Sequence, residues 1–237
     1  MSEIITRRLD YFKTVSYRNR KTITRGDEVN CPVVAYLIDK YKLNLPLADT
    51  IINKDGIGVD SRRRQTCLTD FRGSFFINNK YEEINSFLKW HLENDIRVCE
   101  TRIDICVDFI SNDLTPFKRN SQNYFGKLTK KMTLIPEIYR GKIPTLSQWT
   151  QRCSSYSVIF YDKTFQIQQE APKLLELYPE VYTTQKVKRM ELKIFKPDIY
   201  NFKDRNEDDL VREILDDFYK KHKFSKRNSE IKKLFIY

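Results

Sequence analysis

Three segments of the chain alternate apolar and polar residues, which is the pattern of β-strands with one buried face. They are VCETRIDICVDF at 98–109, SYSVIFYDK at 155–163 and VKRMELKIF at 187–195. The apolar sides of these segments carry Ile103, Ile105, Val107 and Phe109, then Val158 and Phe160, then Met190, Leu192 and Ile194. The pattern predicts three strands whose apolar sides face a common core.

Further elements follow from hydrophobic spacing and turn residues along the chain. Strands are predicted at 6–17 and 71–78, and helices at 33–43, 81–95, 164–178 and 206–221. The basic stretch 112–150 is predicted to be rich in loops, and the tail 222–237 to be a helix or an arm on DNA or on a second subunit. His91 lies on the apolar face of its helix, where a packed structural role is expected. This order predicts an α+β fold with a central, mainly antiparallel sheet, helices on one face and a polar face on the other.

The polar sides of the three strands carry an unusual set of charges. The polar side of the first strand carries Glu100, Arg102, Asp104, Cys106 and Asp108. That of the second carries Ser157, Ile159, Tyr161 and Lys163, and that of the third carries Arg189, Glu191, Lys193 and Phe195. Asp is a poor strand former, so Asp104 and Asp108 need a compensating partner in mid-strand. A divalent cation is one such partner. An ordinary solvated sheet face with cross-strand ion pairs is the alternative.

Composition narrows the classes of partner and of metal site. The 237 residues include 43 Lys+Arg and 32 Asp+Glu, a net charge of +11, which favours a polyanion and most simply nucleic acid. The five Cys form no Cys-x-x-Cys pair, which argues against a zinc ribbon or a disulfide scaffold. The two His, at 91 and 222, cannot form a His-hydrophobic-His metal motif. No segment approaches the roughly 20 apolar residues of a membrane helix, and residues 1–12 lack a signal-peptide pattern. We therefore expect a cytoplasmic protein with no membrane partner.

The charged set suits chemistry on a phosphate. Carboxylates can hold Mg²⁺ or Mn²⁺ on a phosphoryl oxygen, and Lys163, Arg189 or Lys193 can bind the same phosphate. Tyr161 is the best-placed nucleophile among fourteen tyrosines, because it ends a strand on the polar side two residues before Lys163. A free phenol has a pKa of about 10, so it would need activation by a lysine or a metal.

Two basic clusters could contact a DNA backbone. One follows a glycine-containing turn and the other lies in the middle basic stretch; they are Arg62, Arg63 and Arg64, and Lys127, Lys130 and Lys131. A solvated loop is the alternative for either cluster.

The segments Arg102-Ile-Asp104, Tyr161-Asp-Lys163 and Arg189-Met-Glu191 resemble the RxD … YxK … RxE pattern of rolling-circle replication initiators that lack the His-hydrophobic-His motif. These include the Rep_trans plasmid initiators and related conjugative relaxases, and the filamentous-phage gene II replication protein is similar in the same segments. The resemblance covers roughly residues 98–200. It implies that a tyrosine attacks the scissile phosphate, stays joined to the 5′ phosphate, leaves a 3′-hydroxyl primer and later rejoins the ends.

Roles for single residues follow from this resemblance. Tyr161 would be the nucleophile, and Lys163 and Arg189 would bind the phosphate or activate the tyrosine. Asp104 and Glu191 would hold Mg²⁺ or Mn²⁺, with Asp108 as a third ligand, and Arg102 and Lys193 would contact DNA. Residues 1–205 would form the nicking and DNA-binding domain, with 206–237 as a helix and basic tail in the same domain or appended to it.

The resemblance also implies partners. The DNA would be a single-stranded or cruciform origin, copied by a host polymerase. The sequence has no GxxxxGK[ST] motif, so unwinding would need a separate helicase. A homodimer would let two tyrosines act in succession, although nothing in the sequence requires one.

Two other classes stay open. Glu191-Leu192-Lys193 is an ExK downstream of Asp104 or Asp108, as in PD-(D/E)XK nucleases, which activate water on a metal; the long separation between the acids counts against it. A non-enzymatic nucleic-acid-binding protein could stack bases on some of the fifteen Phe and fourteen Tyr, in which case Asp104 and Glu191 would be dispensable.

Overall fold

The computed structural model describes the chain in two compact units. The described residues are 3–17, 31–42, 51–54, 56–60, 66–78, 81–111, 132–139, 142–150, 156–170, 176–195, 205–221 and 229–236. Unit 1 comprises Met1–Leu9, Asp104–Phe195 and Arg205–Tyr237, and unit 2 comprises Asp10–Ile103 and Lys196–Asp204. The predicted C-terminal helix therefore groups with the strands that carry the polar segments.

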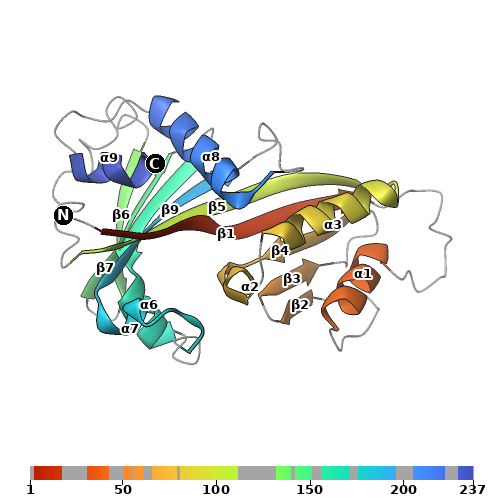
Figure 1. Cartoon of the computed structure of the whole chain (residues 1–237), viewed down its shortest axis with the longest axis horizontal. Helices are drawn as coiled ribbons and strands as arrows, with labels where there is room; N and C mark the ends of the chain where they lie inside the picture. Colours follow the sequence, from red (N-terminus) through yellow and green to blue (C-terminus); the bar gives the residue numbers. More distant parts are fainter. Residues whose placement is uncertain are drawn as a thin grey trace. The chain divides into compact units, whose positions relative to one another are not determined.

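Unit 1 is built on six strands in the order β1-β5-β9-β8-β7-β6. Their bounds are β1 Glu3–Tyr17, β5 Arg97–Ile110, β6 Met132–Tyr139, β7 Lys142–Thr150, β8 Tyr156–Asp162 and β9 Val187–Phe195. The pairs β6/β7, β7/β8 and β8/β9 are antiparallel. The helices described for this unit are α6 Lys163–Glu170, α7 Val181–Thr184, α8 Glu207–Lys221 and α9 Ser229–Phe235. Figure 1 shows α8 and α9 on one side of the strands and α6 and α7 on the other.

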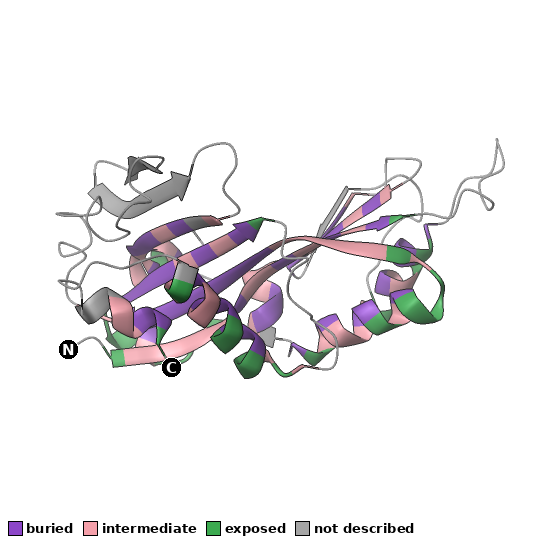
Figure 2. Cartoon of the chain, turned by 90° about the horizontal axis from the view of Figure 1, so that it is seen from above, coloured by how far each residue is buried: buried purple, intermediate pink, exposed green. Residues whose placement is uncertain are grey.

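The core of unit 1 lies between the apolar side of the sheet and α8. Leu210, Val211, Ile214, Leu215 and Phe218 recur at helical spacing and are all buried. The ring of Phe218 lies 5.4 Å from the ring of Tyr156 on β8 and 5.3 Å from that of Phe235 on α9. The purple strand segments of Figure 2 show how continuous this burial is along the sheet. The predicted apolar sides of β5, β8 and β9 therefore face a core, as expected.

Hydrogen bonds hold the start of β1 to the two C-terminal helices. Arg7 Nη2 donates to the carbonyl oxygens of Lys233 (3.0 Å) and Ile236 (2.7 Å), at the end of α9. The Leu9 backbone N–H donates to Glu207 Oε1 at 2.6 Å, at the start of α8. Terminal helix carbonyls have no partner within their own helix, so Arg7 satisfies groups that would otherwise need water.

Unit 2 has five strands in the order β2-β3-β4-β1-β5, with β2 Ile51–Lys54, β3 Ile57–Asp60 and β4 Thr66–Phe71. Gly56 joins β2 to β3 with a φ of +79°, and a Cβ there would lie 2.3 Å from the Phe75 nitrogen, so only glycine fits. The helices are α1 Pro32–Tyr41, α2 Gly73–Asn78 and α3 Glu82–Glu93. They pack on one face of the strands, where the Phe71 ring lies 4.8 Å from Phe75 and 5.2 Å from Phe87.

The α+β class and the mainly antiparallel sheet are confirmed, and so are the strands at β1, β5, β8 and β9 and the helices at α1, α3 and α8. The predicted strand 71–78 is wrong: β4 ends at Phe71 and α2 begins at Gly73. In the helix, the Phe75 ring packs against the Phe71 ring of β4 in the same core. The structure also differs in 112–150, where β6 and β7 form a strand pair, and it places a helix, α9, in the basic tail.

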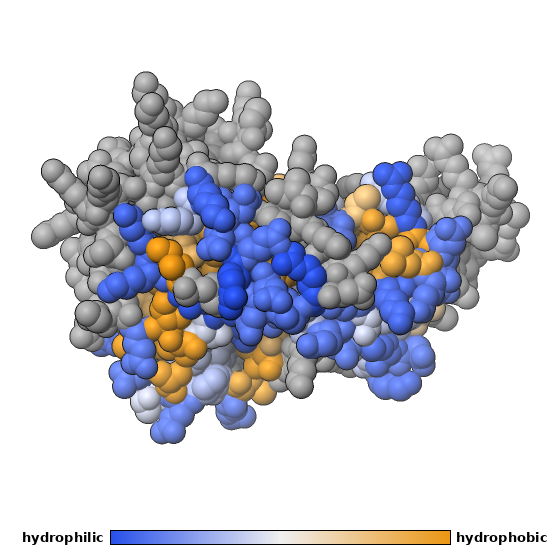
Figure 3. All heavy atoms as spheres, turned by 45° about the horizontal axis from the view of Figure 1, so that its top comes forward, coloured by the Kyte–Doolittle hydropathy of each residue, from blue (hydrophilic) through white to orange (hydrophobic). Residues whose placement is uncertain are grey.

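The exposed apolar side chains are scattered among the described residues. The large ones are Tyr17, Leu92, Leu177, Phe195 and Ile236. Figure 3 shows one face of the molecule, which is mostly hydrophilic with separate apolar groups. Within the described ranges, no helix is long and apolar enough to cross a membrane.

His91 is fully buried on α3, and its protonation should make the stability of unit 2 depend on pH. Its Nδ1–H donates to the Phe87 carbonyl (2.8 Å), which leaves Nε2 to accept from the Ser16 hydroxyl (2.7 Å). Burial lowers the pKa of His91 below its usual value. The unfolded chain therefore takes up a proton below about pH 6.5 that the folded chain resists, and stability falls as pH falls.

We expect the melting temperature to drop between about pH 7.5 and about pH 5.5, and to drop less in His91→Gln, which cannot titrate. Thermal melts followed by circular dichroism at the two pH values measure both quantities. An equal pH dependence in the two proteins would contradict a titrating role for this histidine.

Candidate functional site

The polar sides of β5, β9 and β8 meet in unit 1. On β8 and β9, Tyr161 is paired with Arg189, and Ile159 with Glu191. The Ser111 N–H, just after β5, donates to the Lys186 carbonyl, just before β9, at 3.1 Å. These two strands are therefore antiparallel neighbours, and the polar residues of all three predicted segments lie on adjacent strands.

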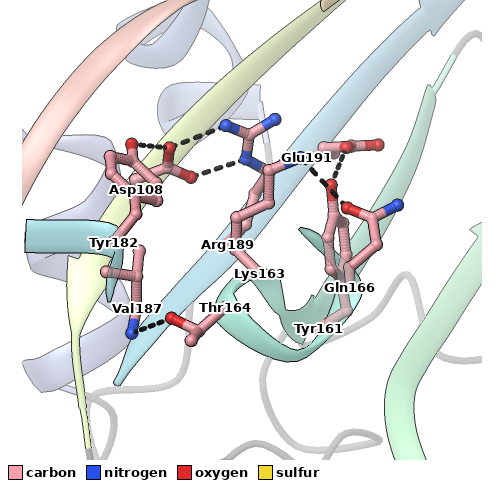
Figure 4. Close-up of polar contacts among 9 residues, drawn as sticks. All are labelled: Asp108, Tyr161, Lys163, Thr164, Gln166, Tyr182, Val187, Arg189 and Glu191. Atoms are coloured by element: carbon pink, nitrogen blue, oxygen red, sulfur yellow. Dashed lines mark hydrogen bonds and ion pairs between the residues drawn. The ribbon is translucent and has the colours of Figure 1, made fainter. Parts of the chain in front are cut away.

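A buried ion pair lies at the centre of this face. Arg189 donates from Nε to Asp108 Oδ1 (2.6 Å) and from Nη2 to Asp108 Oδ2 (2.7 Å), and neither side chain is exposed to solvent. Tyr182, on α7, donates its hydroxyl to the same Oδ2 (Figure 4). Burial, reinforced by the charge of Asp108, raises the pKa of the Tyr182 hydroxyl far above its usual range. Tyr182 therefore stays a hydrogen-bond donor.

Tyr161 is 7% exposed, and its hydroxyl donates to Glu191 Oε1. The other carboxylate oxygen of Glu191 lies 3.6 Å from Lys193 Nζ. Glu191 and Lys193 are two residues apart on β9 and therefore share a face, as the alternation predicts. The YxK and RxE segments thus meet through a direct side-chain contact, which Figure 4 shows.

Asp162 starts the helix that follows Tyr161. Its Oδ1 accepts from the Phe165 backbone N–H at 2.9 Å, which is the geometry of a helix N-cap, and its Oδ2 forms an ion pair with Lys188 of β9. An N-cap is worth about 1 kcal/mol. Lys163 is consequently the first residue of α6 and not the last of a strand, so its prediction as a strand residue is wrong.

The Lys163 side chain folds back beside the tyrosine. Its ammonium donates to Gln166 Oε1 (3.0 Å) and lies 5.8 Å from the Tyr161 ring centroid and 5.6 Å from that of Tyr178. Distances of this size suit cation–π attraction. Only 7% of Lys163 is exposed, so the charge is held close to the phenol.

A small apolar cluster fixes α6 and α7 to the sheet. Ile167, Tyr182 and Val187 form its buried part, and Ile5, Tyr178 and Val181 pack against it. Thr164 adds two bonds, because its Oγ1 donates to the Gln185 carbonyl (3.1 Å) and accepts from the Val187 N–H (3.0 Å). The helix that carries Lys163 is therefore held directly against β9.

Two carboxylates of the polar face, Asp104 and Glu191, have the chemistry of divalent-cation ligands. Asp104 is 3% exposed and lies four residues before Asp108, hence on the same face of β5. Both oxygens of Asp108 already bind Arg189 and Tyr182, and the described residues contain no group of three His, Cys, Asp or Glu side chains placed to hold a metal. Magnesium is commonly bound by one or two carboxylates together with waters and phosphate oxygens. Glu191 also has partners on both oxygens, but its side chain keeps 12% exposure whereas that of Asp108 keeps none, so Asp104 and Glu191 are the better candidates.

The polar face is not an ordinary solvated one. Asp104, Asp108 and Arg189 are buried on it, and so is Lys163 at the start of α6. Among the predicted DNA contacts, Arg102 lies in unit 2, 4.3 Å above the Tyr11 ring, while Lys193 lies beside Glu191. The two predicted basic clusters lie outside the described residues; they are Arg62, Arg63 and Arg64, and Lys127, Lys130 and Lys131.

Sequence reasoning did not single out Asp162, Tyr182 or Lys188. An Asp directly before the helical pattern of 163–170 is a helix-start signature and could have revealed Asp162. Tyr182 lies in a four-residue helix, and Lys188 on the apolar side of its strand, so no periodicity marks them.

Comparison with known proteins shows similarity to a solved structure. No protein-family model matches the sequence, and no curated protein does either. The solved structure of a rolling circle replication initiator protein from Geobacillus stearothermophilus is similar with a TM-score of 0.56 and 14% sequence identity, over 97% of this chain and 89% of that chain. At this identity the likeness shows a shared fold.

Removing Arg189 should destabilise the protein strongly, because Asp108 would be left as a buried charge without its ion-pair partner. We expect Arg189→Ala to lower the free energy of unfolding by about 3–5 kcal/mol. Tyr182→Phe, which deletes one hydroxyl bond to Asp108, should cost about 1–3 kcal/mol and keep the protein folded. Urea unfolding measures both.

The matched control is Lys89→Ala, which breaks the exposed pair between Lys89 and Glu93 on α3. It should cost less than about 1 kcal/mol. Losses for Arg189→Ala and Tyr182→Phe no larger than this control would show that the buried cluster is not a stabilising element.

Proposed function

We propose that this chain is a replication initiator that nicks and rejoins DNA by tyrosine attack on a phosphodiester. The observation that carries the proposal is the hydrogen bond from the Tyr161 hydroxyl to Glu191, which joins the YxK and RxE segments in one buried site. The fold shared with a rolling circle replication initiator supports it. An origin in single-stranded or cruciform form is the proposed substrate, with a host helicase and polymerase as partners.

The proposed step transfers a DNA strand end to the protein. The Tyr161 oxygen bonds to the scissile phosphorus, the bond from phosphorus to the 3′ oxygen breaks, and that oxygen takes up a proton. The phenol proton lies on the hydrogen bond to Glu191, which is therefore the acceptor within reach. The products are a 5′-phosphotyrosyl bond and a free 3′-hydroxyl, and attack by a 3′-hydroxyl on that bond reverses the reaction.

Asp104 and Glu191 are the residues proposed to hold Mg²⁺ or Mn²⁺, whose charge would offset the charge that develops on the phosphate. Lys163 is proposed to add a second positive charge, since its ammonium already lies beside the Tyr161 ring. Arg189 uses Nε and Nη2 on Asp108, so we assign both of these residues to positioning the strands. This role replaces the phosphate contact and the metal ligation expected of them from sequence.

A second function keeps some support. Glu191 and Lys193 pair at 3.6 Å on β9, as an ExK nuclease that activates water would require. Such an enzyme would cut DNA without a protein-DNA bond, and Tyr161 would be incidental. A conjugative relaxase would share the tyrosine chemistry and differ only in the biological use of the nick.

Covalent capture separates these functions. The full chain is incubated with Mn²⁺ and single-stranded oligonucleotides tiled across the DNA around its own coding region, each labelled at the 3′ or the 5′ end. Tyrosine attack should transfer only the 3′ label to protein that survives denaturing electrophoresis. Tyr161→Phe should give no adduct, whereas Tyr178→Phe, which alters a neighbouring tyrosine, should still form one. Cleavage that continues in Tyr161→Phe would favour the water-activating nuclease.

Glu191 should matter for cleavage and little for DNA affinity. We expect Glu191→Gln to reduce nicking by about 100-fold or more, while the affinity for the same oligonucleotide stays within about three-fold, because basic side chains dominate phosphate binding. Glu213→Gln, on the exposed part of α8, is the matched control. A loss of affinity that parallels the loss of nicking would contradict this division of roles.

A further inference from the structure

One face of the unit 2 strands combines tyrosines with basic side chains. Along β1, burial alternates strictly from Tyr11 to Tyr17: Phe12, Thr14 and Ser16 are buried, and the residues between them are not. The buried side contacts the helices, since the Ser16 hydroxyl bonds to His91 of α3. Tyr11, Lys13, Val15 and Tyr17 consequently point to the opposite side, which no helix described for unit 2 covers.

Each of the two tyrosines on this side lies under a guanidinium group of β5. The Arg102 group is 4.3 Å from the Tyr11 ring centroid, and the Arg97 group is 5.2 Å from that of Tyr17. Tyr17 is 41% exposed, so much of its surface is open to a ligand. The tyrosines are six residue steps apart along the strand, which corresponds to about 20 Å. The distance is long enough for several nucleotides of an extended strand.

The charge of this face is positive on balance. Lys13 is paired across the strands with Asp70, but Asp70 also binds Arg72, whose Nε lies 2.7 Å from Asp70 Oδ1. Glu100 lies between Arg97 and Arg102 in β5 and adds a second acid. Four basic side chains (Lys13, Arg72, Arg97 and Arg102) and two acidic ones (Asp70 and Glu100) therefore lie on β1, β4 and β5 or directly after β4, and β1 carries the two tyrosines.

We propose that this face, which we call the tyrosine-arginine platform (Tyr11, Lys13, Tyr17, Arg97 and Arg102), binds single-stranded DNA. Tyrosine rings and guanidinium planes stack on unpaired bases, and guanidinium and ammonium groups bind phosphates. Duplex DNA keeps its bases stacked inside, so it would use only the charges. The inference rests on the proposed function in taking DNA as the ligand, and it places a second contact in unit 2, whereas Tyr161 lies in unit 1.

Binding can be measured apart from cleavage. The full chain carrying Tyr161→Phe is titrated against fluorescein-labelled oligothymidylate and against a duplex of equal length, with EDTA present, by fluorescence anisotropy. Tyr17→Ala should weaken single-strand binding by about five-fold or more and duplex binding by less than about two-fold. Arg97→Ala should reduce the slope of log affinity against log salt by about 0.7 for the single strand.

Two controls test the location. Lys89→Ala and Leu92→Ala remove an exposed cation and an exposed apolar side chain from α3, on the helix-bearing side of unit 2. They should leave single-strand affinity within about two-fold. Photo-crosslinking to an iodouracil oligonucleotide, followed by mass spectrometry, should recover the peptide that contains Tyr11 or Tyr17.

The outcomes separate this proposal from the nicking mechanism. Two results with Tyr17→Ala would overturn the platform: an unchanged single-strand affinity, or equal losses of affinity for duplex and single strand. Losses of the same size in the α3 controls, or crosslinks only outside residues 10–17, would overturn it as well. None of these outcomes affects the covalent adduct assigned to Tyr161. Conversely, a failed adduct test leaves the anisotropy result unchanged, because no cleavage occurs in Tyr161→Phe.

Discussion

The buried ion pair between Asp108 and Arg189 is the interaction on which the candidate site depends. Two charges withdrawn from water are tolerated only when their geometry is good and the remaining polar atoms are satisfied. Here Arg189 uses two parallel bonds, and Tyr182 occupies a third position on the carboxylate. The pair also joins β5 to β9 and, through Tyr182, to α7. Because the α6–α7 cluster packs around Tyr182, the placement of Lys163 beside Tyr161 follows from the same contact.

The acids and bases of the molecule have different surroundings in the two units. In unit 1, Asp104, Asp108 and Glu191 are largely withdrawn from water and lie among lysines and an arginine. Carboxylates would repel a phosphate, so their presence at the proposed phosphate site suits bond breaking assisted by a cation better than simple binding. In unit 2, the platform holds its cations over aromatic rings, which suits contact with a strand that is bound and not cut.

Much of this arrangement could be predicted from the sequence, because alternation along a strand fixes which residues share a face. Alternation predicts the polar faces that carry Asp104, Asp108, Tyr161, Arg189 and Glu191. The structure brings their strands, β5, β8 and β9, together. Partners within the face could not be predicted, because cross-strand register depends on the whole sheet. Alternation places Asp108 on the polar face, where the sequence predicts a metal ligand, yet its partner is Arg189. Phe75 and Phe76 fit a strand by composition, and only packing against Phe71 favours a helix there.

The path of the chain through β1 and β5 has a consequence for how such a protein could diversify. Unit 1 continues into unit 2 along β1 at residue 10 and resumes along β5 at residue 104, and these two strands are neighbours in the sheet. Residues 10–103, which make up unit 2 apart from Lys196–Asp204, therefore occupy the position of a hairpin loop, enlarged into a structure with its own core. A loop of this kind can be exchanged between proteins by recombination at two adjacent points, without changing the strand order around Tyr161. Inheritance of the proposed chemistry and inheritance of the proposed second DNA contact would then be separable, with one framework joined to many different inserts.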